Sequence, residues 1–533
     1  MRVLPAGKGM ALAELDDLPQ TLGLLASLQA EPLEGVSEIV PGARTLLISF
    51  DAHRHSLQSL AAELSRRPLV MPQAEHGTLV EIPVYYDGED LYAIAALLNI
   101  SPDDVVRRHT GTDWFVAFSG FAPGFAYLTG GDALLRQVAR LKSPRTSVPP
   151  GAVALAGGFS AVYPKASPGG WQILGQTPLA MWDLNRDPPA LLQPGHRVRF
   201  VDAGQRPAKL QKPPAPLPLP AAPDLKGPAL AIRHPGLQAL LQDLGRPGQA
   251  RHGVSASGAM VPSALRAANR LVGNCTDTAC IEVAQGGFEV QSQGDTVVAV
   301  TGAAGPLTLT AADGRSWHVA RYAPLALNDG DRLQFGEPEG GVRSYLALRG
   351  GFHRMPVMGS LSFDTLAQIG PAPLAAGEVL AGRAQQTLSA VGDPTTPQAD
   401  LPRPGELVTL DVLLGPRTDW FTREAVDLLG TQEWAVTPQS NRVGLRLQGA
   451  EPLERAVMSE LPSEGTALGA IQVPANGQPV LFLADHPLTG GYPVIGCIAP
   501  WHLDLTGQIP VGARIRFNVV AGFDPVSLPH RTE

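Results

Sequence analysis

The sequence predicts a mostly β protein with α+β parts, divided among several domains. Glycine (58) and proline (51) together supply about a fifth of the 533 residues, while 44% of the residues are hydrophobic. Frequent turns, combined with enough apolar residues to build cores, fit short strands better than long helices. A chain of this length also exceeds what one compact core can organise.

A repeated phrase gives the strongest indication of how the β domains are organised. GGWQILG at 169–175 returns as GGYPVIG at 490–496. Two further pairs precede these phrases in the same order, PPGAVAL (149–155) with ALGAIQV (467–473) and GFAYL (124–128) with GLRLQ (444–448). Small changes in loop length explain the drift in spacing. The order predicts two copies of one β-barrel-like domain; chance similarity in a glycine-rich chain is the alternative.

The N-terminal residues alternate between strand and helix patterns. Period-2 and helical apolar spacing predict a βαββαβ-like unit from strand 10–15, helix 18–29, strands 36–40 and 44–50, helix 56–66 and strand 78–86. Asp17 is placed to cap the first helix, with Pro19 in its first turn. Strand 78–86 is expected to close this small unit.

A proline-rich seam at 204–228 separates two halves of the chain. Pairs such as Pro213-Pro214 favour an extended, semi-rigid spacer. We therefore expect a small α+β domain (1–82), a β domain (83–204), the linker (205–228), a first β-rich domain of the second half (229–405) and a second β domain (406–533).

Charge and cysteine content limit the classes of partner and compartment. The formal charge of −8 with no basic run argues against nucleic acid and against an acidic membrane surface. Cys275, Cys280 and Cys497 form no CxxC pair, so a disulfide framework is not expected. Acidic residues interrupt the N-terminus before a signal-peptide core could form, and no apolar run reaches membrane-spanning length. We expect a soluble cytoplasmic protein.

Specific motifs in both halves resemble a known pair of subunits. FSGFAPGFAYL (118–128), SPRTSVPPGAVALAGG (143–158) and YPKASPGGWQILGQTP (163–178) resemble the first subunit of the allophanate-hydrolase-subunit or carboxyltransferase family, which includes the B subunit of 5-oxoprolinase and kinase-inhibitor-like proteins. The second half is similar to the C subunit of 5-oxoprolinase in LLQDLGRPGQARHGVSASGAM (240–260), RAANRLVGN (266–274), TPQSNRVGLRLQG (437–449), GAIQVPANGQPV (469–480) and LTGGYPVIG (488–496). The chain resembles a fusion of the 5-oxoprolinase/urea amidolyase type. This resemblance implies cyclophilin-like β-barrels for 83–204 and 406–533.

The second half departs from the family pattern at four positions. Val261 and Ala304 stand where the family usually has aspartate, and Leu361 and Phe363 replace the usual arginine and threonine. An aliphatic chain cannot replace a carboxylate or a guanidinium in catalysis. These changes bear on whether the family's activity is retained.

The resemblance implies three alternative functions. The first is ATP-dependent opening of 5-oxoproline to glutamate, with a separate partner that resembles the A subunit of 5-oxoprolinase and with ATP and Mg²⁺ as cofactors. The second is carboxyl transfer from carboxybiotin to urea or a similar amide. The third is non-catalytic inhibition of a sensor histidine kinase. The chain has no Met-Lys-Met biotin attachment site and no evident ATP-grasp domain, so biotin is not expected on this chain and the first function is preferred. Whether the chain forms a homo-oligomer is left open.

Candidate site residues come from the matching motifs. A carboxylate among them could hold Mg²⁺ or act as a base, so the catalytic candidates are Asp243, Arg246, His252, Arg442, Glu464 and Asp485. Glycine-rich backbone and pocket walls give the candidates for substrate or nucleotide binding, namely Phe121, Pro123, Gly124, Tyr127, Arg145, Gly169, Gly170, Trp171, Gln472, Gly490, Gly491 and Tyr492.

Each candidate also has a structural alternative. The glycines fit tight barrel corners, Trp171 and Tyr492 fit cores, and Arg145 fits a solvated surface. Asp243 and Arg246, three residues apart, fit an ion pair with each other. If Trp171 and Tyr492 are counterparts, two facing barrels could build one site at their junction.

Overall fold

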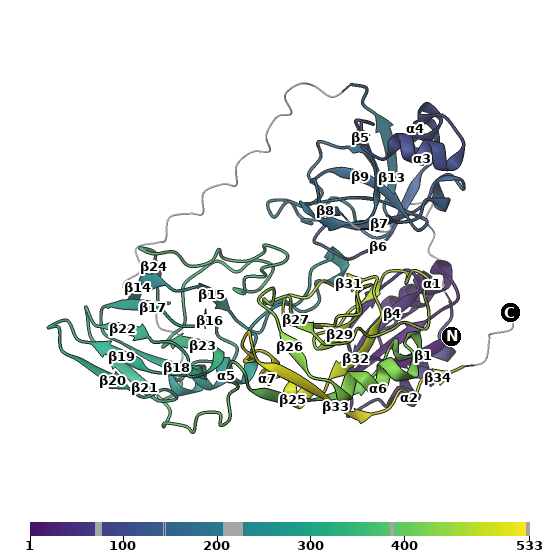
Figure 1. Cartoon of the computed structure of the whole chain (residues 1–533). Coiled ribbons are helices and arrows are strands. Elements are labelled where there is room, and N and C mark those ends of the chain that lie inside the picture. Colours follow the sequence, from purple (N-terminus) through teal and green to yellow (C-terminus); the bar gives the residue numbers. More distant parts are fainter. Residues whose placement is uncertain (70–76, 142, 144, 206–226, 384–387, 529–533) are drawn as a thin grey trace.

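The computed structural model describes residues 1–69, 77–141, 143, 145–205, 227–383 and 388–528 (Figure 1). Figure 1 shows a first barrel at the top, a central pair of sheets at lower left, and a second barrel packed with the N-terminal domain at lower right. The fold is mostly β, as predicted. Most of the expected linker, residues 206–226, lies outside the described residues.

The N-terminal domain contains β1 (Arg2–Pro5), β2 (Met10–Glu14), α1 (Leu18–Ala30), β3 (Val36–Pro41), β4 (Thr45–Phe50) and α2 (Leu57–Arg66). The Asp17 carboxylate caps α1 by accepting the Gln20 N–H at 2.8 Å, as the sequence predicted. The sheet order is β3-β4-β2-β1-β34, and β34 (Val526–Ser527) comes from the far end of the chain.

The prediction that strand 78–86 closes the sheet of this domain is wrong. β5 (Leu79–Val84) joins the first barrel instead, where it runs parallel to β13 (Arg197–Asp202). The physical reason is burial, because Ile82 and Val84 lie fully inside the core of that barrel. Strand β34 occupies the edge beside β1 instead.

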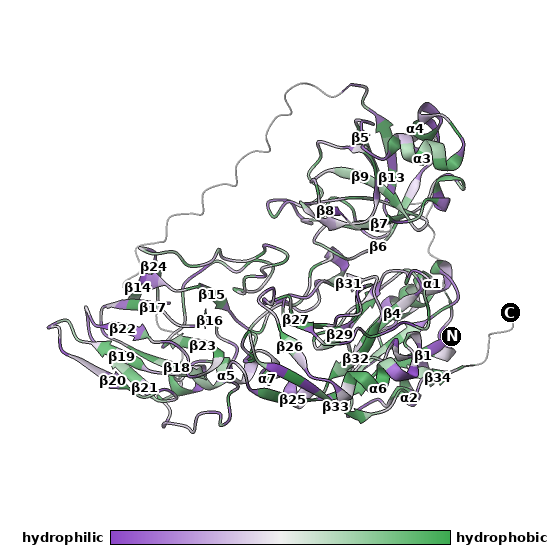
Figure 2. Cartoon of the chain, in the orientation of Figure 1, coloured by the Kyte–Doolittle hydropathy of each residue, from purple (hydrophilic) through white to green (hydrophobic). Residues whose placement is uncertain are grey.

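The first barrel has the strand order β12-β9-β10-β7-β6-β13-β5. Its other strands are β6 (Trp114–Ser119), β7 (Ala126–Gly130), β9 (Ala152–Ala156), β10 (Phe159–Val162) and β12 (Gln172–Gln176). Two backbone hydrogen bonds of 2.9 Å between Tyr85 and Gln176 bring its open edges together. Helices α3 (Leu91–Leu98) and α4 (Pro102–Thr110) precede β6, η2 (Leu135–Gln137) follows β7, and β8 (Arg145–Val148) pairs with β11 (Ser167–Gly169). Figure 2 shows α3 to be hydrophobic along most of its length.

The second barrel is closed, with the order β25-β32-β29-β30-β27-β26-β33. Its strands are β25 (Leu407–Leu414), β26 (Trp434–Val436), β27 (Gly444–Gln448), β29 (Ala470–Gln472), β30 (Val480–Phe482), β32 (Val494–Ile498) and β33 (Arg514–Ala521). β28 (Glu464–Gly465) pairs with β31 (Thr489–Gly490). η4 (Thr418–Trp420) and α6 (Arg423–Thr431) follow β25, and η5 (Pro500–His502) and α7 (Leu503–Thr506) precede β33.

The two barrels share one topology, which confirms the predicted duplication. Their strand orders match one for one, so β7, β9 and β12 correspond to β27, β29 and β32, the strands of the three phrase pairs. Each barrel also joins its first and last strands in parallel. An unpredicted pair agrees: the indole N–H of Trp114 donates to the His109 carbonyl at 3.2 Å, and that of Trp434 to the Leu429 carbonyl at 3.1 Å. Chance similarity does not account for this agreement.

Two sheets form the central domain, with the orders β20-β19-β22-β17-β14-β24 and β15-β16-β23-β18-β21. Their strands are β14 (Ala229–Pro235), β15 (Gln238–Gln242), β16 (Cys280–Ala284), β17 (Phe288–Gln293), β18 (Thr296–Ala304), β19 (Leu307–Thr310), β20 (Ser316–Val319), β21 (Pro324–Leu327), β22 (Arg332–Phe335), β23 (Gly340–Leu348) and β24 (Val379–Ala381). Side chains of both sheets share one hydrophobic core. Between β15 and β16 lie η3 (Ala250–His252) and α5 (Pro262–Leu271), and α5 packs on β18 and β23.

The cores of the parts continue into one another. Val261 and Leu265, at the start of α5, share a cluster with second-barrel residues such as Ile471. Leu12 and Leu47 of the N-terminal sheet pack with Phe482 of the second barrel. The three cysteines are free thiols. In the described ranges, no helix combines the length and apolar character that a membrane crossing requires.

Candidate functional site

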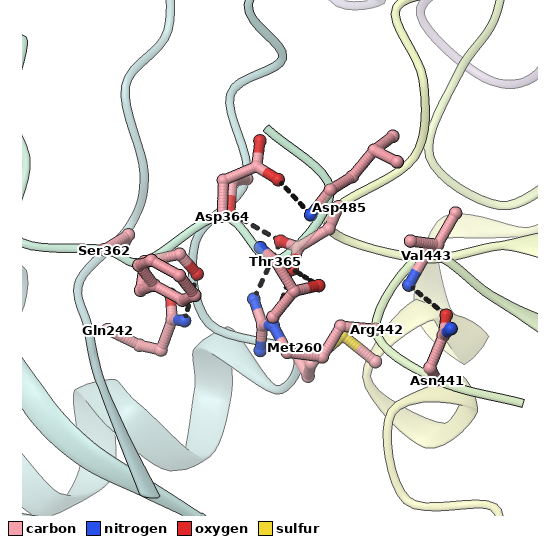
Figure 3. Close-up of polar contacts among 12 residues, drawn as sticks. Gln242, Met260, Ser362, Asp364, Thr365, Asn441, Arg442, Val443 and Asp485 are labelled. Carbon is pink, nitrogen blue, oxygen red and sulfur yellow. Dashed lines mark hydrogen bonds and ion pairs between the residues drawn. The ribbon is translucent and has the colours of Figure 1, made fainter. Parts of the chain in front are cut away.

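A buried polar cluster lies where the loops of the central domain meet the second barrel (Figure 3). Asp243 and Arg246 follow β15, and Asp364 lies between β23 and β24. Arg442 precedes β27 and Asp485 follows β30, and because these strands are antiparallel partners the two residues share one barrel end. The backbone N–H of Asp485 donates to the Arg442 carbonyl at 3.0 Å.

Arg442 is the fully paired cation of the cluster. Its Nε and Nη2 donate to the two Asp485 carboxylate oxygens at 2.9 and 3.0 Å, and Nη1 pairs with Glu282. Nη2 also donates to the Gly258 carbonyl at 2.6 Å. Burial opposes the charge, but the Asp485 and Glu282 carboxylates outweigh it and raise the pKa of Arg442. Arg442 therefore stays charged in a site that excludes water.

Asp485 is buried completely and has partners on every side. Besides Arg442, it accepts the Ser257 hydroxyl at 2.6 Å and the hydroxyl and N–H of Thr365 at 2.7 and 2.9 Å. Burial alone would raise the pKa of Asp485, but Arg442 and these hydrogen bonds lower it. Asp485 is thus held as a carboxylate.

Glu282 connects this pair to the start of α5. Its Oε2 accepts the Tyr345 hydroxyl at 2.7 Å and the Met260 N–H at 2.9 Å. The Val261 N–H donates to the Tyr345 hydroxyl at 2.8 Å. Val261 itself is fully buried in the apolar core, so its side chain adds no polar group here.

Arg246 is a cation of the cluster whose hydrogen bonds are incomplete. Its Nη2 donates to the Ser362 carbonyl, whereas its buried Nε and Nη1 have no hydrogen-bond partner among the described residues. Burial lowers the pKa of Arg246, and the Asp364, Asp243 and Asp485 charges oppose that shift. Two N–H bearing atoms therefore remain available in a region with little solvent.

The expected ion pair between Asp243 and Arg246 is wrong. The Asp243 carboxylate instead accepts the hydroxyls of Ser360 and Ser362, each at 2.6 Å, and the N–H of Leu361 at 2.7 Å. It also accepts the Gly245 N–H at 2.8 Å. Four short hydrogen bonds satisfy this carboxylate locally, so its role is to fix the 360–362 loop.

Asp364 was missed by sequence reasoning, although it directly follows the substituted residue Phe363. Its Oδ1 accepts the N–H groups of Leu366 and Ala367 at 2.9 and 2.8 Å, and its Oδ2 accepts the Ser255 hydroxyl at 3.1 Å. Burial and the nearby Asp485 charge raise the pKa of Asp364 to about 6. Asp364 can therefore exchange a proton near neutral pH.

Lys165 brings the first half of the chain to this cluster. It lies between β10 and β11, and its Nζ donates to the Leu366 carbonyl, two residues from Asp364. Burial lowers the pKa of Lys165, and the Asp364 charge opposes this shift. The sequence signal for Lys165 is its place in YPKASPGG, a motif in which only the glycines were predicted to bind a ligand.

Leu361 and Phe363 lie beside these residues, whereas Ala304 does not. Leu361 and Phe363 are buried on either side of Ser362, the residue that binds Asp243 and Arg246. Ala304 is exposed at the end of β18 and belongs to a separate surface hollow of about 470 Å³ with Gly340 and Arg403.

His252 and Glu464 take other positions. The His252 carbonyl accepts the Gly124 N–H at 3.0 Å, which joins the first barrel to the end of η3. Burial and Arg251 lower the pKa of His252, so the ring is neutral at pH 7.

Glu464 binds Arg417 at 2.8 Å, and Arg417 binds Glu14 at 2.7 Å. Burial raises the pKa of Glu464, and Arg417 opposes this. Glu464 thus ties the N-terminal domain to the second barrel.

The glycine-rich motifs of the first barrel lie at its contact with the second barrel. The Phe121 N–H donates to the Thr489 hydroxyl at 2.8 Å, and the Tyr127 hydroxyl donates to that of Ser463 at 3.2 Å. Pro123 lies in the same turn as Gly124, whose φ of +75° favours glycine. These contacts make the motif an interface between the two halves.

Arg145 and Trp171 are satisfied within the first barrel. Arg145 pairs with Glu89 at 2.6 Å and Asp90 at 2.7 Å, so it is neither a solvated arginine nor a free anion ligand. The Trp171 ring packs on Phe125 and Tyr127, with ring centroids 5.5 and 5.6 Å apart. Gly169 leaves room for the Tyr163 hydroxyl, and the Gly170 carbonyl accepts the Leu141 N–H at 2.8 Å.

The counterpart segment of the second barrel is also well packed. Gln472 Nε2 donates to the Tyr492 carbonyl at 3.1 Å and leaves little room beside Gly490. The Arg455 guanidinium lies 5.6 Å from the Tyr492 ring centroid. Gly491 allows Arg140 of the first barrel to approach. None of the ring contacts of the described residues joins Trp171 to Tyr492, and a site between the two rings stays a prediction.

Comparison with known proteins assigns the family. Residues 252–519 match the carboxyltransferase domain, subdomains A and B, and residues 1–192 match the carboxyltransferase domain, subdomains C and D. The chain belongs to the carboxyltransferase-domain family. Its resemblance to the B and C subunits of 5-oxoprolinase is therefore confirmed at the level of the family.

Relatives of this carboxyltransferase-domain chain cover its halves separately and together. It is 36% identical to the 5-oxoprolinase C subunit of Escherichia coli K12 over 293 residues, which covers 54% of this chain and 90% of that protein. It is 36% identical to the 5-oxoprolinase B subunit of Bacillus subtilis 168 over 196 residues, which covers 34% of this chain and 81% of that protein. The crystal structure of TTHA0988 matches with a TM-score of 0.80 and 34% identity, covering 96% of this chain and 99% of that one.

Proposed function

We propose that this chain is the fused B and C component of an ATP-dependent 5-oxoprolinase that works with a separate A subunit. The observation that supports this most directly is that the two halves of one chain match the B and C subunits of 5-oxoprolinase at 36% identity each. The matches cover 81% and 90% of those relatives, so each half has most of a subunit. The contacts between the halves at Phe121, Tyr127 and Gly124 fit two subunits that act together.

The described residues around Arg246 do not fit ATP. Asp364, Asp243 and Asp485 lie near its guanidinium, and their charges would repel a triphosphate. In the described ranges, no group of three or more His, Cys, Asp or Glu side chains is arranged to hold a metal ion. We therefore assign the cyclic amide, and not the nucleotide, to the cluster around Arg246.

Asp364 supplies the proton chemistry that ring opening requires. Water that attacks the lactam carbonyl must lose a proton, and the ring nitrogen must gain one as the C–N bond breaks. With its pKa raised to about 6 by burial and by Asp485, Asp364 can take up the first proton and return it to the nitrogen. Asp485, locked on Arg442, keeps the charge that tunes Asp364.

Reconstitution tests this function. The chain is mixed with a 5-oxoprolinase A subunit that is active with its own B and C partners, and ADP and glutamate are measured with and without 5-oxoproline. We expect ATP hydrolysis that depends on 5-oxoproline and on both proteins, with glutamate formed in equal amount to ADP. No 5-oxoproline-dependent turnover from the folded chain and this competent partner would overturn the proposal.

Carboxyl transfer is the second candidate, because the matching family models describe carboxyltransferase subdomains. Transfer from carboxybiotin to urea would need biotin and its carboxylase on other chains. The same preparation supplied with carboxybiotin and urea distinguishes the two functions. Consumption of carboxybiotin that depends on urea, with no glutamate formed from 5-oxoproline, would favour carboxyl transfer.

A further inference from the structure

Three charged side chains from both halves converge on one short segment, residues 362–367. Arg246 donates to the Ser362 carbonyl, Lys165 donates to the Leu366 carbonyl, and Asp364 lies between these two carbonyls in the chain. Lys165 belongs to the first barrel, whereas the other two belong to the central domain. The segment therefore joins the two halves through charged groups.

The convergence leaves hydrogen-bonding capacity unused. Arg246 is only 2% exposed, and its Nε and Nη1 have no partner in the described part of the chain. An ammonium carries three N–H donors, and Lys165 uses one of them on Leu366. Buried donors without partners are rare in folded proteins and usually indicate a ligand or an ordered water.

A buried acceptor that bonds to the same segment is also unused. Gln242 Nε2 donates to the Phe363 carbonyl at 2.9 Å, while its buried Oε1 has no partner in the described residues. Arg246 and Gln242 thus attach to consecutive carbonyls, Ser362 and Phe363, with free donors on one side chain and a free acceptor on the other. A group that pairs with Arg246 must be an acceptor, and an anion gives the strongest pairing with a guanidinium; a group that pairs with Gln242 Oε1 must carry an N–H or O–H.

The acidic surroundings limit which anion fits. Asp364 and Asp485 lie near Arg246, so a multiply charged phosphate is disfavoured, whereas a single carboxylate can pair with a guanidinium and an ammonium. Urea carries no negative charge, so its carbonyl would accept the Arg246 N–H groups without the additional strength of a carboxylate. A small cyclic amino-acid amide carries one carboxylate and one amide N–H, so it meets these requirements.

We propose that Arg246 and Lys165 bind the carboxylate of the cyclic amide substrate, so that the substrate lies across the junction of the two halves with its ring beside Asp364. This assignment rests on the proposed 5-oxoprolinase function. It gives Lys165 a role in substrate recognition that only the joined halves can provide, because Arg246 lies on the other half.

The test compares three ligands of similar size. 5-Oxoproline has both groups, 2-pyrrolidinone has the lactam without the carboxylate, and cyclopentanecarboxylate has the carboxylate without the lactam. Their binding to the full chain is measured by calorimetry, and KM is measured in the complex with the A subunit. We expect 5-oxoproline to bind at least about tenfold more tightly than 2-pyrrolidinone, the order expected for a charge-assisted pair.

Substitutions then assign the effect to the two cations. Arg246→Gln and Lys165→Met should each raise KM for 5-oxoproline at least about tenfold and weaken cyclopentanecarboxylate binding, while Arg246→Lys should retain part of it. Lys8→Met, at an exposed lysine of the N-terminal domain, is the matched control and should behave as the unaltered chain. Thermal unfolding checks the buried Arg246 variants, and Lys165→Met provides an independent arm.

The outcomes separate this site from the overall function. Wild-type KM values in both variants of an active complex, or equal affinity for 5-oxoproline and 2-pyrrolidinone, would overturn the site and leave the function standing. If the complex fails to turn over 5-oxoproline but cyclopentanecarboxylate binding still depends on both cations, the function fails and the carboxylate site stands. Absence of carboxylate binding to the unaltered chain would also overturn the site.

Discussion

Arg442 and Arg246 are both buried in the second half, and both lie near Asp485, yet their guanidinium groups have opposite surroundings. Every nitrogen of Arg442 has a partner, from Asp485, Glu282 and the Gly258 carbonyl. Arg246 has the Ser362 carbonyl alone, with Nε and Nη1 unpaired among the described residues. Correspondingly, the neighbouring carboxylates raise the pKa of Arg442, whereas burial lowers that of Arg246.

The difference separates a structural cation from a binding cation. A buried charge costs free energy unless its hydrogen bonds are complete, and Arg442 meets that condition within the protein. Arg246 does not meet it, so part of the free-energy cost of burying its guanidinium remains, and a bound ligand could offset that part. The carboxylates of Asp485 and Asp364 differ in the same way. Asp485 is ion-paired with Arg442, whereas Asp364 accepts hydrogen bonds from two backbone N–H groups and one serine hydroxyl.

The largest expected effect comes from removing the structural cation. Arg442→Met should lower the free energy of unfolding by about 3–5 kcal/mol, because it leaves Asp485 buried without its ion-pair partner and leaves Glu282 with only the longer contact to Arg343, at 3.6 Å. Arg246→Met should change it by only about 1 kcal/mol, because it deletes two unpaired N–H bearing atoms together with one hydrogen bond. Urea denaturation at pH 7, followed by tryptophan fluorescence, measures both. Equal losses would contradict the distinction.

The two aspartates give the next largest effect, and its sign depends on pH. The folded pKa of Asp364 is raised from 3.8 to about 6, so between these values the folded state holds more protons than the unfolded chain. Stability due to Asp364 therefore falls as pH rises through this window and is constant above it. Arg442 and the hydrogen bonds lower the pKa of Asp485, so its contribution is present above its unfolded pKa and is lost in acid.

Asparagine substitutions should reveal the two opposite signs. Relative to the unaltered chain, Asp364→Asn should be more stable at pH 8 than at pH 4 by on the order of 1–3 kcal/mol. Asp485→Asn should be less stable at pH 8 by about 3 kcal/mol, with the difference narrowing in acid. Denaturation curves collected from pH 4 to pH 8 supply both profiles. Parallel profiles for the two variants would show that the aspartates share one role.

Much of the architecture was predictable because local sequence patterns determine the strands and helices. The repeated phrases at 169–175 and 490–496 located matching strands of the two barrels, and Asp17 capped its helix as expected. Strand 78–86 was assigned to the wrong sheet, since a strand pattern specifies burial and not the neighbouring strand. The edge beside β1 is filled by β34, more than 500 residues away in sequence, a pairing that no local pattern indicates.

The site was harder to predict than the fold. The motifs contained Asp243, Arg246, Arg442 and Asp485, but the sequence could not show that Asp243 fixes a loop and leaves Arg246 unpaired. Asp364 gives no local signal, because its raised pKa comes from tertiary burial and from the distant Asp485. Glu464, predicted as catalytic, lies in a separate ion-pair network with Arg417 and Glu14. Lys165 donates to the Leu366 carbonyl of the other half of the chain, and only the tertiary structure reveals this contact.

The smallest expected effect comes from two serines, one on each aspartate. The Ser255 hydroxyl donates to Asp364 at 3.1 Å and the Ser257 hydroxyl to Asp485 at 2.6 Å. The Ser255 hydrogen bond lowers the pKa of Asp364, so Ser255→Ala should raise that pKa further above 6 by a few tenths of a unit. The pH range over which stability falls should then move upward, with a cost at pH 7 of about 0.5–1 kcal/mol.

Ser257→Ala is the matched control, because Arg442 keeps Asp485 ionised without the serine. The midpoint of Asp364 titration, followed by carboxyl carbon NMR or by the pH dependence of unfolding, should move in Ser255→Ala and stay fixed in Ser257→Ala. A shift in both variants would mean that the two aspartates titrate as one coupled group, and the separation between a locked and a titrating carboxylate would be lost.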